Sequence, residues 1–110
     1  MMRKGYVDGT FGQIHYRLAE AQSDGGKPAL ICLHQSPKSG LEFETFMREA
    51  SRDRLVIAPD YPGYGMSDPA PSEDATTIPM YAEEMWRVVD GLGLSTVDLF
   101  GNHTVAKVAA

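Results

Sequence analysis

The sequence predicts an α/β fold in which an N-terminal antiparallel hairpin precedes mainly parallel strands with flanking helices. Three observations support this prediction. Residues 13–18 alternate between apolar and polar side chains, which is the period of a half-buried strand. Residues 29–33 and 55–58 are continuous apolar runs, which are typical of strands covered on both faces. A segment with helical spacing follows each of these runs.

The hairpin is predicted within the first 18 residues. Residues 6–7 and 13–18 supply its strands, and Gly9 and Gly12 favour a turn between them. The second strand is expected to place Ile14, Tyr16 and Leu18 on one face and Gln13, His15 and Arg17 on the other. A glycine-rich turn over residues 23–28 then leads into strand 29–33.

The first helix is predicted within residues 39–50, where apolar side chains recur at helical spacing. These side chains are Phe43, Phe46, Met47 and Ala50. Strand 55–58 is expected to stop at Pro59, because proline has no amide proton for the sheet. The segment from Pro59 to Pro71 is rich in glycine and proline and is predicted to be a loop.

The second helix is predicted to begin at Thr76 or Thr77, with Pro79 in its first turn, and to end at Gly91 or Gly93. Its expected apolar stripe comprises Ile78, Tyr81, Met85, Val88 or Val89, and Leu92. Residues 97–100 form the last predicted strand, and its unpaired edge would favour self-association.

Composition restricts the class of protein. The chain has 110 residues, 43% of them hydrophobic and 23% charged, which is ordinary for one globular domain. Fifteen acidic and ten basic residues give a net charge of −5 without any basic run, which disfavours nucleic acid and anionic membranes as partners. The single cysteine, Cys32, is predicted to be a small buried hydrophobe. Because one cysteine cannot form an internal disulfide, a reducing, cytoplasmic location is expected.

Three segments with chemical potential follow the three predicted apolar strands. They are residues 34–37, residues 59–68 and residues 101–105. Open α/β sheets bind their ligands at the carboxyl ends of their strands, so these segments are expected to lie together.

These segments resemble motifs of the α/β-hydrolase family, and the resemblance extends over essentially the whole chain. Residues 34–37 are similar to the His-Gly-x-Pro oxyanion segment, and residues 60–67 match the Asp-x-x-Gly-x-Gly-x-Ser loop. Residues 101–105 occupy the place of the Gly-x-Ser-x-Gly nucleophile elbow. The resemblance implies that residues 1–110 form the N-terminal part of an α/β-hydrolase fold, without its C-terminal strands and helices. It also implies hydrolysis of a small ester, amide or related substrate.

The resemblance assigns an oxyanion hole to the backbone amides of Ser36 and Thr104. His34 and Gln35 are the residues it places beside the substrate, although Gln35 stands where the family usually has glycine. An alternative interpretation of His34 is that its ring bonds nearby backbone and holds the loop in place.

His103 stands at the centre of the elbow, where the family carries Ser, Asp or Cys. Its imidazole could act as a nucleophile or transfer a proton, or it could line a ligand site without catalysis. A local irregularity of the sequence is a third interpretation. Val105 also departs from the pattern, because the elbow requires a small residue there.

The loop from Asp60 to Ser67 is interpreted as scaffolding. Asp60 and Ser67 can bond local backbone groups, and Gly63 and Gly65 can adopt dihedral angles that other residues resist. A phosphate cradle is the alternative, but the loop has neither a complete Gly-x-Gly-x-x-Gly nor a P-loop lysine. No cofactor or metal is therefore expected.

The acid and the histidine base that the resemblance implies come after the elbow in the family, so this chain is expected to be incomplete as a catalyst. A small-molecule substrate or ligand is the expected partner in either of two hypotheses. The first is a hydrolase, and the second is a non-catalytic protein that binds a small molecule or partner beside His103. A truncated reading frame with no independent role is a third.

Overall fold

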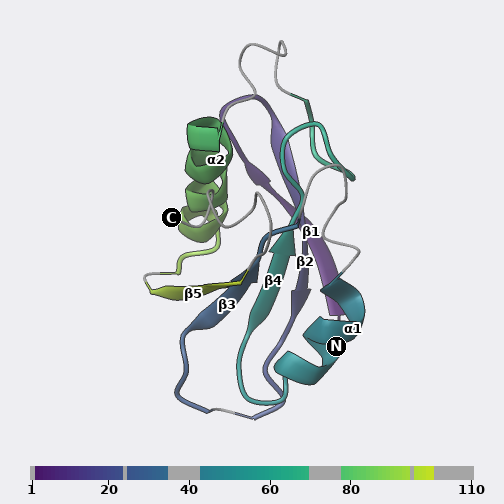
Figure 1. The fold of residues 1–110 in the computed structure, drawn as a ribbon, viewed down its shortest axis with the longest axis vertical. Coiled ribbons are helices and arrows are strands. Elements are labelled where there is room, and N and C mark those ends of the chain that lie inside the picture. Colours follow the sequence, from purple (N-terminus) through teal and green to yellow (C-terminus); the bar gives the residue numbers. More distant parts are fainter. Residues whose placement is uncertain (1, 24, 35–42, 70–77, 95, 101–110) are drawn as a thin grey trace.

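The structure is a computed structural model that describes residues 2–23, 25–34, 43–69, 78–94 and 96–100. Within these residues, five strands form one mixed sheet and two helices flank it (Figure 1). In chain order the elements are β1 (Met2–Asp8), β2 (Gln13–Ala19), β3 (Ala29–Cys32), α1 (Glu44–Ala50), β4 (Val56–Pro59), α2 (Ile78–Gly91) and β5 (Val97–Phe100).

The strand order in the sheet is β1-β2-β4-β3-β5. Strands β1 and β2 form the predicted antiparallel hairpin, in which Val7 lies opposite Ile14. The pairing of β2 with β4 is also antiparallel, whereas β3 pairs in parallel with both β4 and β5. The predicted fold class is therefore confirmed: a hairpin leads into mainly parallel strands with flanking helices.

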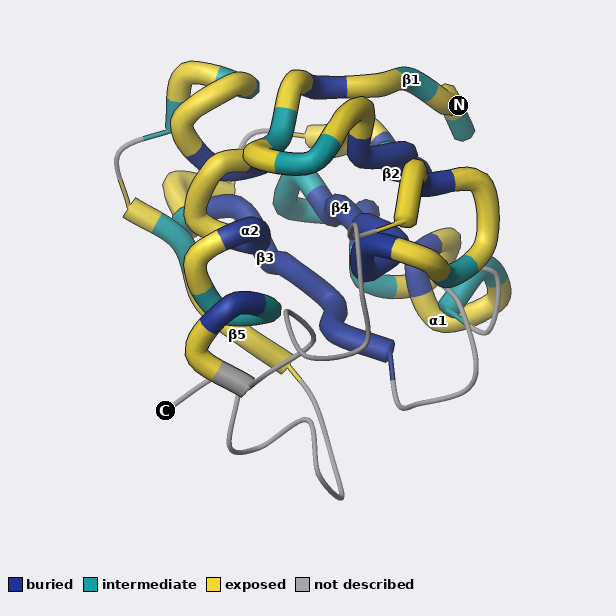
Figure 2. The backbone as a smooth tube through the Cα atoms, turned by 90° about the horizontal axis from the view of Figure 1, so that it is seen from above, coloured by how far each residue is buried: buried dark blue, intermediate teal, exposed yellow. Residues whose placement is uncertain are grey.

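The two helices lie on opposite faces of the sheet, and each face has its own apolar core. Along β3 the side chains alternate, so that Ile31 joins the core beneath α2 while Leu30 and Cys32 join the core beneath α1. Helix α2 contributes Met85, Val88 and Val89 to the first core, and α1 contributes Met47 to the second. Figure 2 shows the buried stretches of β3 and β4 between the two helices.

Strand β2 differs from the prediction, because both of its faces are covered. His15 is 3% exposed and Arg17 is 7% exposed, although the alternating pattern predicts that they face solvent. Helix α1 reaches this polar face at Arg17, whose Nε donates to the Glu44 carboxylate at 3.0 Å, and the loop after β4 contacts His15. The alternation of side chains is correct, but the prediction of a half-buried strand is wrong.

Both helices are placed as predicted, with differences at their ends. Helix α1 begins at Glu44, and residues 39–42 of the predicted helix lie outside the described residues, as do the predicted caps Thr76 and Thr77. Helix α2 ends at Gly91 in a Schellman motif. The Leu94 amide donates to the Val89 carbonyl and the Gly93 amide donates to the Asp90 carbonyl, with Gly93 at φ +72°.

A buried carboxylate joins the hairpin turn to α2. Glu84 is 1% exposed, and its carboxylate accepts hydrogen bonds from the Thr10 amide at 2.7 Å and the Thr10 hydroxyl at 2.8 Å. Arg87, one turn further along the helix, donates to the same carboxylate at 3.2 Å. The turn is thereby fixed to a helix that lies 74 residues away in the sequence.

Candidate active site

The three parallel strands that the motifs follow in the sequence end close together, at one end of the sheet. The parallel strands β3, β4 and β5 end at Cys32, Pro59 and Phe100, and the motif segments follow them. The Leu33 amide donates to the Phe100 carbonyl at 2.9 Å, which joins the ends of β3 and β5. The Tyr61 amide donates to Nε2 of His34 at 2.9 Å, which joins the ends of β3 and β4. The ends of the three strands, which the motifs follow in the sequence, therefore lie side by side.

His34 is fully buried beneath an aromatic cluster. Its ring lies 4.2 Å from the ring of Tyr61 and 5.6 Å from that of Tyr64, measured between centroids. Because the Tyr61 amide can only donate, Nε2 of His34 must accept, and the proton of the neutral imidazole is then on Nδ1. This contact agrees with the interpretation of His34 as a residue that holds a loop. Its role beside the substrate stays a prediction.

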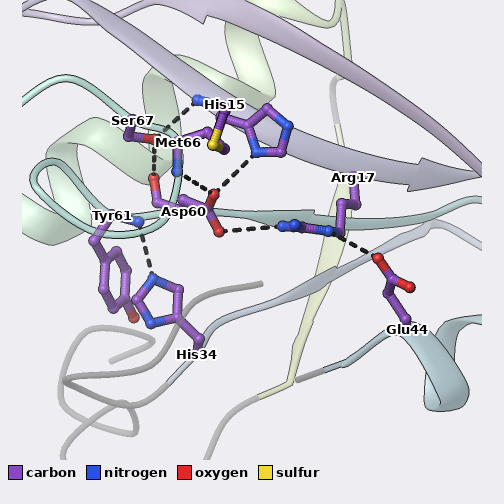
Figure 3. A network of polar contacts seen from close by, with 8 residues as sticks. All are labelled: His15, Arg17, His34, Glu44, Asp60, Tyr61, Met66 and Ser67. Carbon is purple, nitrogen blue, oxygen red and sulfur yellow. Dashed lines mark hydrogen bonds and ion pairs between the residues drawn. The ribbon is translucent and has the colours of Figure 1, made fainter. Parts of the chain in front are cut away.

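The carboxylate of Asp60 lies at the centre of the loop that follows β4 (Figure 3). This side chain is fully buried, and its Oδ2 accepts the Met66 amide at 3.0 Å and lies 2.9 Å from Nδ1 of His15. The hydroxyl of Ser67 donates to the Asp60 carbonyl at 2.7 Å and accepts the His15 amide at 2.8 Å. The predicted local bonding of Asp60 and Ser67 is confirmed.

Arg17 extends this network across the sheet to α1. Its Nη1 lies 3.6 Å from Oδ1 of Asp60, and its Nε donates to Glu44. A buried carboxylate flanked by a guanidinium and an imidazole is stabilised in its place by these partners. We therefore regard Asp60 as part of the scaffold of the site.

The glycines of this loop have the backbone geometry that the motif predicts. Gly63 lies at φ +83° and Gly65 at φ +52°, in the left-handed region that favours glycine. A Cβ atom added at Gly65 would lie only 2.5 Å from Cγ of Asp60. The glycine therefore allows the backbone to approach the carboxylate that organises the loop.

The sequence did not reveal the polar partners of Asp60. His15 and Arg17 belong to no motif, and their period-2 spacing alone indicates only a shared strand face. That face is covered by the loop after β4, which contacts His15, and by Glu44 of α1, which contacts Arg17, and no local pattern places either there. One signal was available in the sequence: His15 and Arg17 share the strand face opposite the apolar one, so they could have been expected to bind a common partner.

Tyr81 of α2 belongs to the same aromatic cluster and packs against the rings of Tyr61 and Tyr64. Its ring centroid lies 4.9 Å from that of Tyr61 and 6.5 Å from that of Tyr64. Burial, the electrostatic effect of the adjacent Tyr64 hydroxyl and a hydrogen bond with it together raise the pKa of the Tyr81 hydroxyl. The Tyr81 hydroxyl is therefore neutral at physiological pH.

The other predicted site residues lie outside the described residues. They are Gln35 and Ser36 after β3, and His103, Thr104 and Val105 after β5. The oxyanion amides and the elbow accordingly stay predictions. Among the described residues, no cluster of three or more His, Cys, Asp or Glu side chains could hold a metal ion.

Cys32 is fully buried in the core beneath α1, as predicted. Burial raises the pKa of its thiol to about 12, so the thiolate that a reactive cysteine needs is not formed at physiological pH. In the part of the chain that the structure describes, no helix has the length and apolar character required to cross a membrane.

A family model described as the alpha/beta hydrolase fold matches residues 28–102. The chain therefore belongs to the α/β-hydrolase fold family. This match covers all three strand ends discussed above.

Individual relatives have different chemistries. The chain is 26% identical to a proline iminopeptidase of Heyndrickxia coagulans over 110 residues, which cover all of this chain and 38% of that protein. It is 28% identical to epoxide hydrolase 4 of Mus musculus over 97 residues, which cover 88% of this chain and 26% of that protein. A crystal structure of an N-acyl homoserine lactonase with N-hexanoyl homoserine has a TM-score of 0.87 and 26% identity, covering 99% of this chain and 39% of the lactonase. The chain thus spans less than two fifths of the length of each.

Proposed function

We propose that this chain is part of a hydrolase of small ester, amide or related substrates and carries the oxyanion side of its site. The observation that supports the proposal is the junction of the three strand ends, made by the Leu33–Phe100 and His34–Tyr61 hydrogen bonds. Segments that continue from these ends start from one place at the edge of the sheet, where α/β proteins bind their ligands.

In this proposal, the amides of Ser36 and Thr104 donate to the oxygen that becomes negative as the substrate carbonyl is attacked. His103 occupies the position of the nucleophile, and His34 and Gln35 lie beside the substrate. Attack by the imidazole would break the bond to the leaving group and form an acyl-imidazole, which water then hydrolyses. The relatives act on different substrates, so we propose no single one.

The test uses the whole hydrolase of which this chain is proposed to be a part, and compares it with its His103→Ala and Asp90→Asn variants, the second of which changes an exposed side chain of α2. The panel contains p-nitrophenyl esters, N-hexanoyl homoserine lactone and proline p-nitroanilide, and mass spectrometry follows any acyl adduct. Because a free imidazole cleaves activated esters slowly, each rate is compared with that of the urea-unfolded chain. We expect turnover above that background, lost in His103→Ala and kept in Asp90→Asn. Absence of both turnover and acylation would overturn the proposal.

A second candidate function is binding without catalysis, on the same fold and at the same strand ends. It is favoured by the departures from the family motifs at Gln35, His103 and Val105. In that case the panel gives no turnover, while N-hexanoyl homoserine lactone or another panel compound binds saturably in calorimetry and His103→Ala abolishes binding. Hydrolysis that disappears in His103→Ala would contradict this candidate.

A further inference from the structure

Two histidines from the strands on either side of β4 hold the two residues that follow β4. His15 of β2 contacts the carboxylate of Asp60, and His34, which follows β3, accepts the amide proton of Tyr61. Both rings are buried, at 3% and 0% exposure. Figure 3 shows that the two rings approach the Asp60–Tyr61 segment from different strands.

We infer that Asp60, Ser67 and His15 are positioning residues of the proposed hydrolase site, which fix His34 in its Nδ1–H tautomer by orienting the Asp60–Tyr61 peptide unit. The role in turnover rests on the proposed function. The tautomer itself follows from the contacts among the described residues.

The argument starts from one planar peptide group. The carbonyl of Asp60 and the amide of Tyr61 belong to the same peptide unit, whose trans geometry directs the C=O and N–H in opposite directions. The Ser67 hydroxyl donates to this carbonyl at 2.7 Å, and the amide donates to Nε2 of His34 at 2.9 Å. A group held on its oxygen by Ser67 therefore presents its N–H to His34.

The rest of the network holds Ser67 and Asp60 themselves. The His15 amide donates to the Ser67 hydroxyl at 2.8 Å, and the Asp60 amide donates to the His15 carbonyl at 2.8 Å. The Asp60 carboxylate in turn accepts the Met66 amide and contacts the His15 ring. Neither end of the peptide unit can rotate without breaking buried hydrogen bonds, which costs about 1–3 kcal/mol for each group left unsatisfied.

A fixed tautomer matters because His34 begins the predicted oxyanion segment. With Nε2 engaged by Tyr61, Nδ1 is the ring nitrogen that carries the proton, and the ring has one orientation. Supporting hydrogen bonds of this kind set which ring nitrogen of a histidine is protonated and lock its rotamer. The predicted oxyanion segment therefore begins with a side chain whose tautomer and orientation are fixed.

The experiment is ¹⁵N NMR of the histidine rings in protein labelled at histidine, where the shifts distinguish protonated from unprotonated ring nitrogens. His34 and His103 are assigned with His34→Gln and His103→Gln, and the remaining signals belong to His15. We expect His34 of the unaltered protein to show a protonated Nδ1 and an unprotonated Nε2. In Asp60→Asn and in Ser67→Ala we expect the two shifts of His34 to move toward each other as both tautomers become populated. Ser67→Thr, which keeps a hydroxyl, is expected to give the same His34 shifts as the unaltered protein.

Glu84→Gln is the matched control, because Glu84 is also a buried carboxylate but bonds Thr10 and Arg87. We expect it to leave the His34 spectrum unchanged. Ser67→Ala removes a single hydroxyl, so it tests the inference if Asp60→Asn does not fold. Protonation of His34 at Nε2 in the unaltered protein, or an unchanged spectrum in the folded variants, would overturn the inference. Failure of the proposed hydrolysis leaves these spectra unaffected, so the two failures are distinguishable.

Discussion

The loop after β4 and the strand β5 reach the same edge of the sheet, but they are stabilised in different ways. In the loop, Asp60 is fully buried, and its carboxylate contacts the His15 ring, the Met66 amide and the Arg17 guanidinium. In β5, by contrast, Leu99 is 40% exposed and Phe100 is 41% exposed. The loop is therefore held by a buried polar network, whereas β5 presents half-exposed apolar side chains.

This difference indicates that the loop after β4 resists changes in its geometry more than β5 does. Removing one member of a buried network leaves charges without partners, which is far more costly than trimming a half-exposed apolar side chain. We expect the loop to keep its geometry independently and β5 to respond to whatever covers it. The following predictions test that difference.

The largest effect is expected from Asp60→Ala. The substitution leaves Arg17 and His15 without their buried carboxylate, so we expect the free energy of unfolding to fall by about 3–5 kcal/mol in urea titrations. The matched control in β5 is Asp98→Ala, which breaks only a surface pair with Arg54. Its expected cost is about 0–1 kcal/mol. Equal costs for the two variants would contradict the comparison.

A smaller loss is expected from Gly65→Ala. Alanine at φ +52° is strained, and its Cβ would collide with the Asp60 carboxylate, so we expect a loss of about 2–3 kcal/mol. Gly93→Ala, on the way into β5, is strained at φ +72° but meets no atom within 4 Å. It should cost only about 1–2 kcal/mol in the same urea titrations. A Gly93 variant as unstable as the Gly65 variant would show that the carboxylate contact is unimportant.

Ionisation of the Cys32 thiol reports whether water reaches β3 next to β5, because Cys32 pairs with Phe100 in the sheet. Its pKa rises from an ordinary 9.0 to about 12 on burial, so the neutral thiol stabilises the fold fully below pH 9.0. That contribution is lost as the pH rises from 9.0 toward 12, at about 1.4 kcal/mol per pH unit. Unfolding of the protein and of Cys32→Ala between pH 8 and 11 checks this slope, which the variant should lack. Parallel curves would mean that water reaches the thiol.

The smallest effect is expected at the aromatic contact between β5 and α1. The rings of Phe100 and Phe46 are stacked at a centroid distance of 5.0 Å and an interplanar angle of 15°. A double-mutant cycle with Phe46→Ala and Phe100→Ala should give a coupling of about 0.5–1.5 kcal/mol. A coupling near zero would show that the stack contributes nothing to stability.

Much of the fold could be predicted from the sequence, because the strands and helices carry their own periodicity. The apolar runs at residues 29–33 and 55–58 became β3 and β4 within one residue at each end, and residues 97–100 became β5. The glycine pattern of the loop after β4 predicted its positive φ angles. These features depend on neighbours in the sequence.

The contacts that organise the candidate site could not be predicted from the sequence in this way. His15 meets Asp60 across 45 residues, and Tyr61 meets His34 across 27 residues. Such partners are set by which strands become neighbours and by which helix covers them, and periodicity does not encode either choice. For the same reason Arg17 was expected in solvent, and Glu84 was not recognised as the anchor of the hairpin turn.

The position of β4 between β2 and β3 has a consequence for folding during synthesis on the ribosome. Strands β2 and β3 emerge first, and each lacks its shared neighbour until Val56–Pro59 is made. Their backbone donors and acceptors stay open to other chains during that interval, which is the condition that invites misassembly. Pairing with β4 satisfies both strands at once, so we expect the open backbone groups of β2 and β3 to be covered once residues 56–59 have left the ribosome.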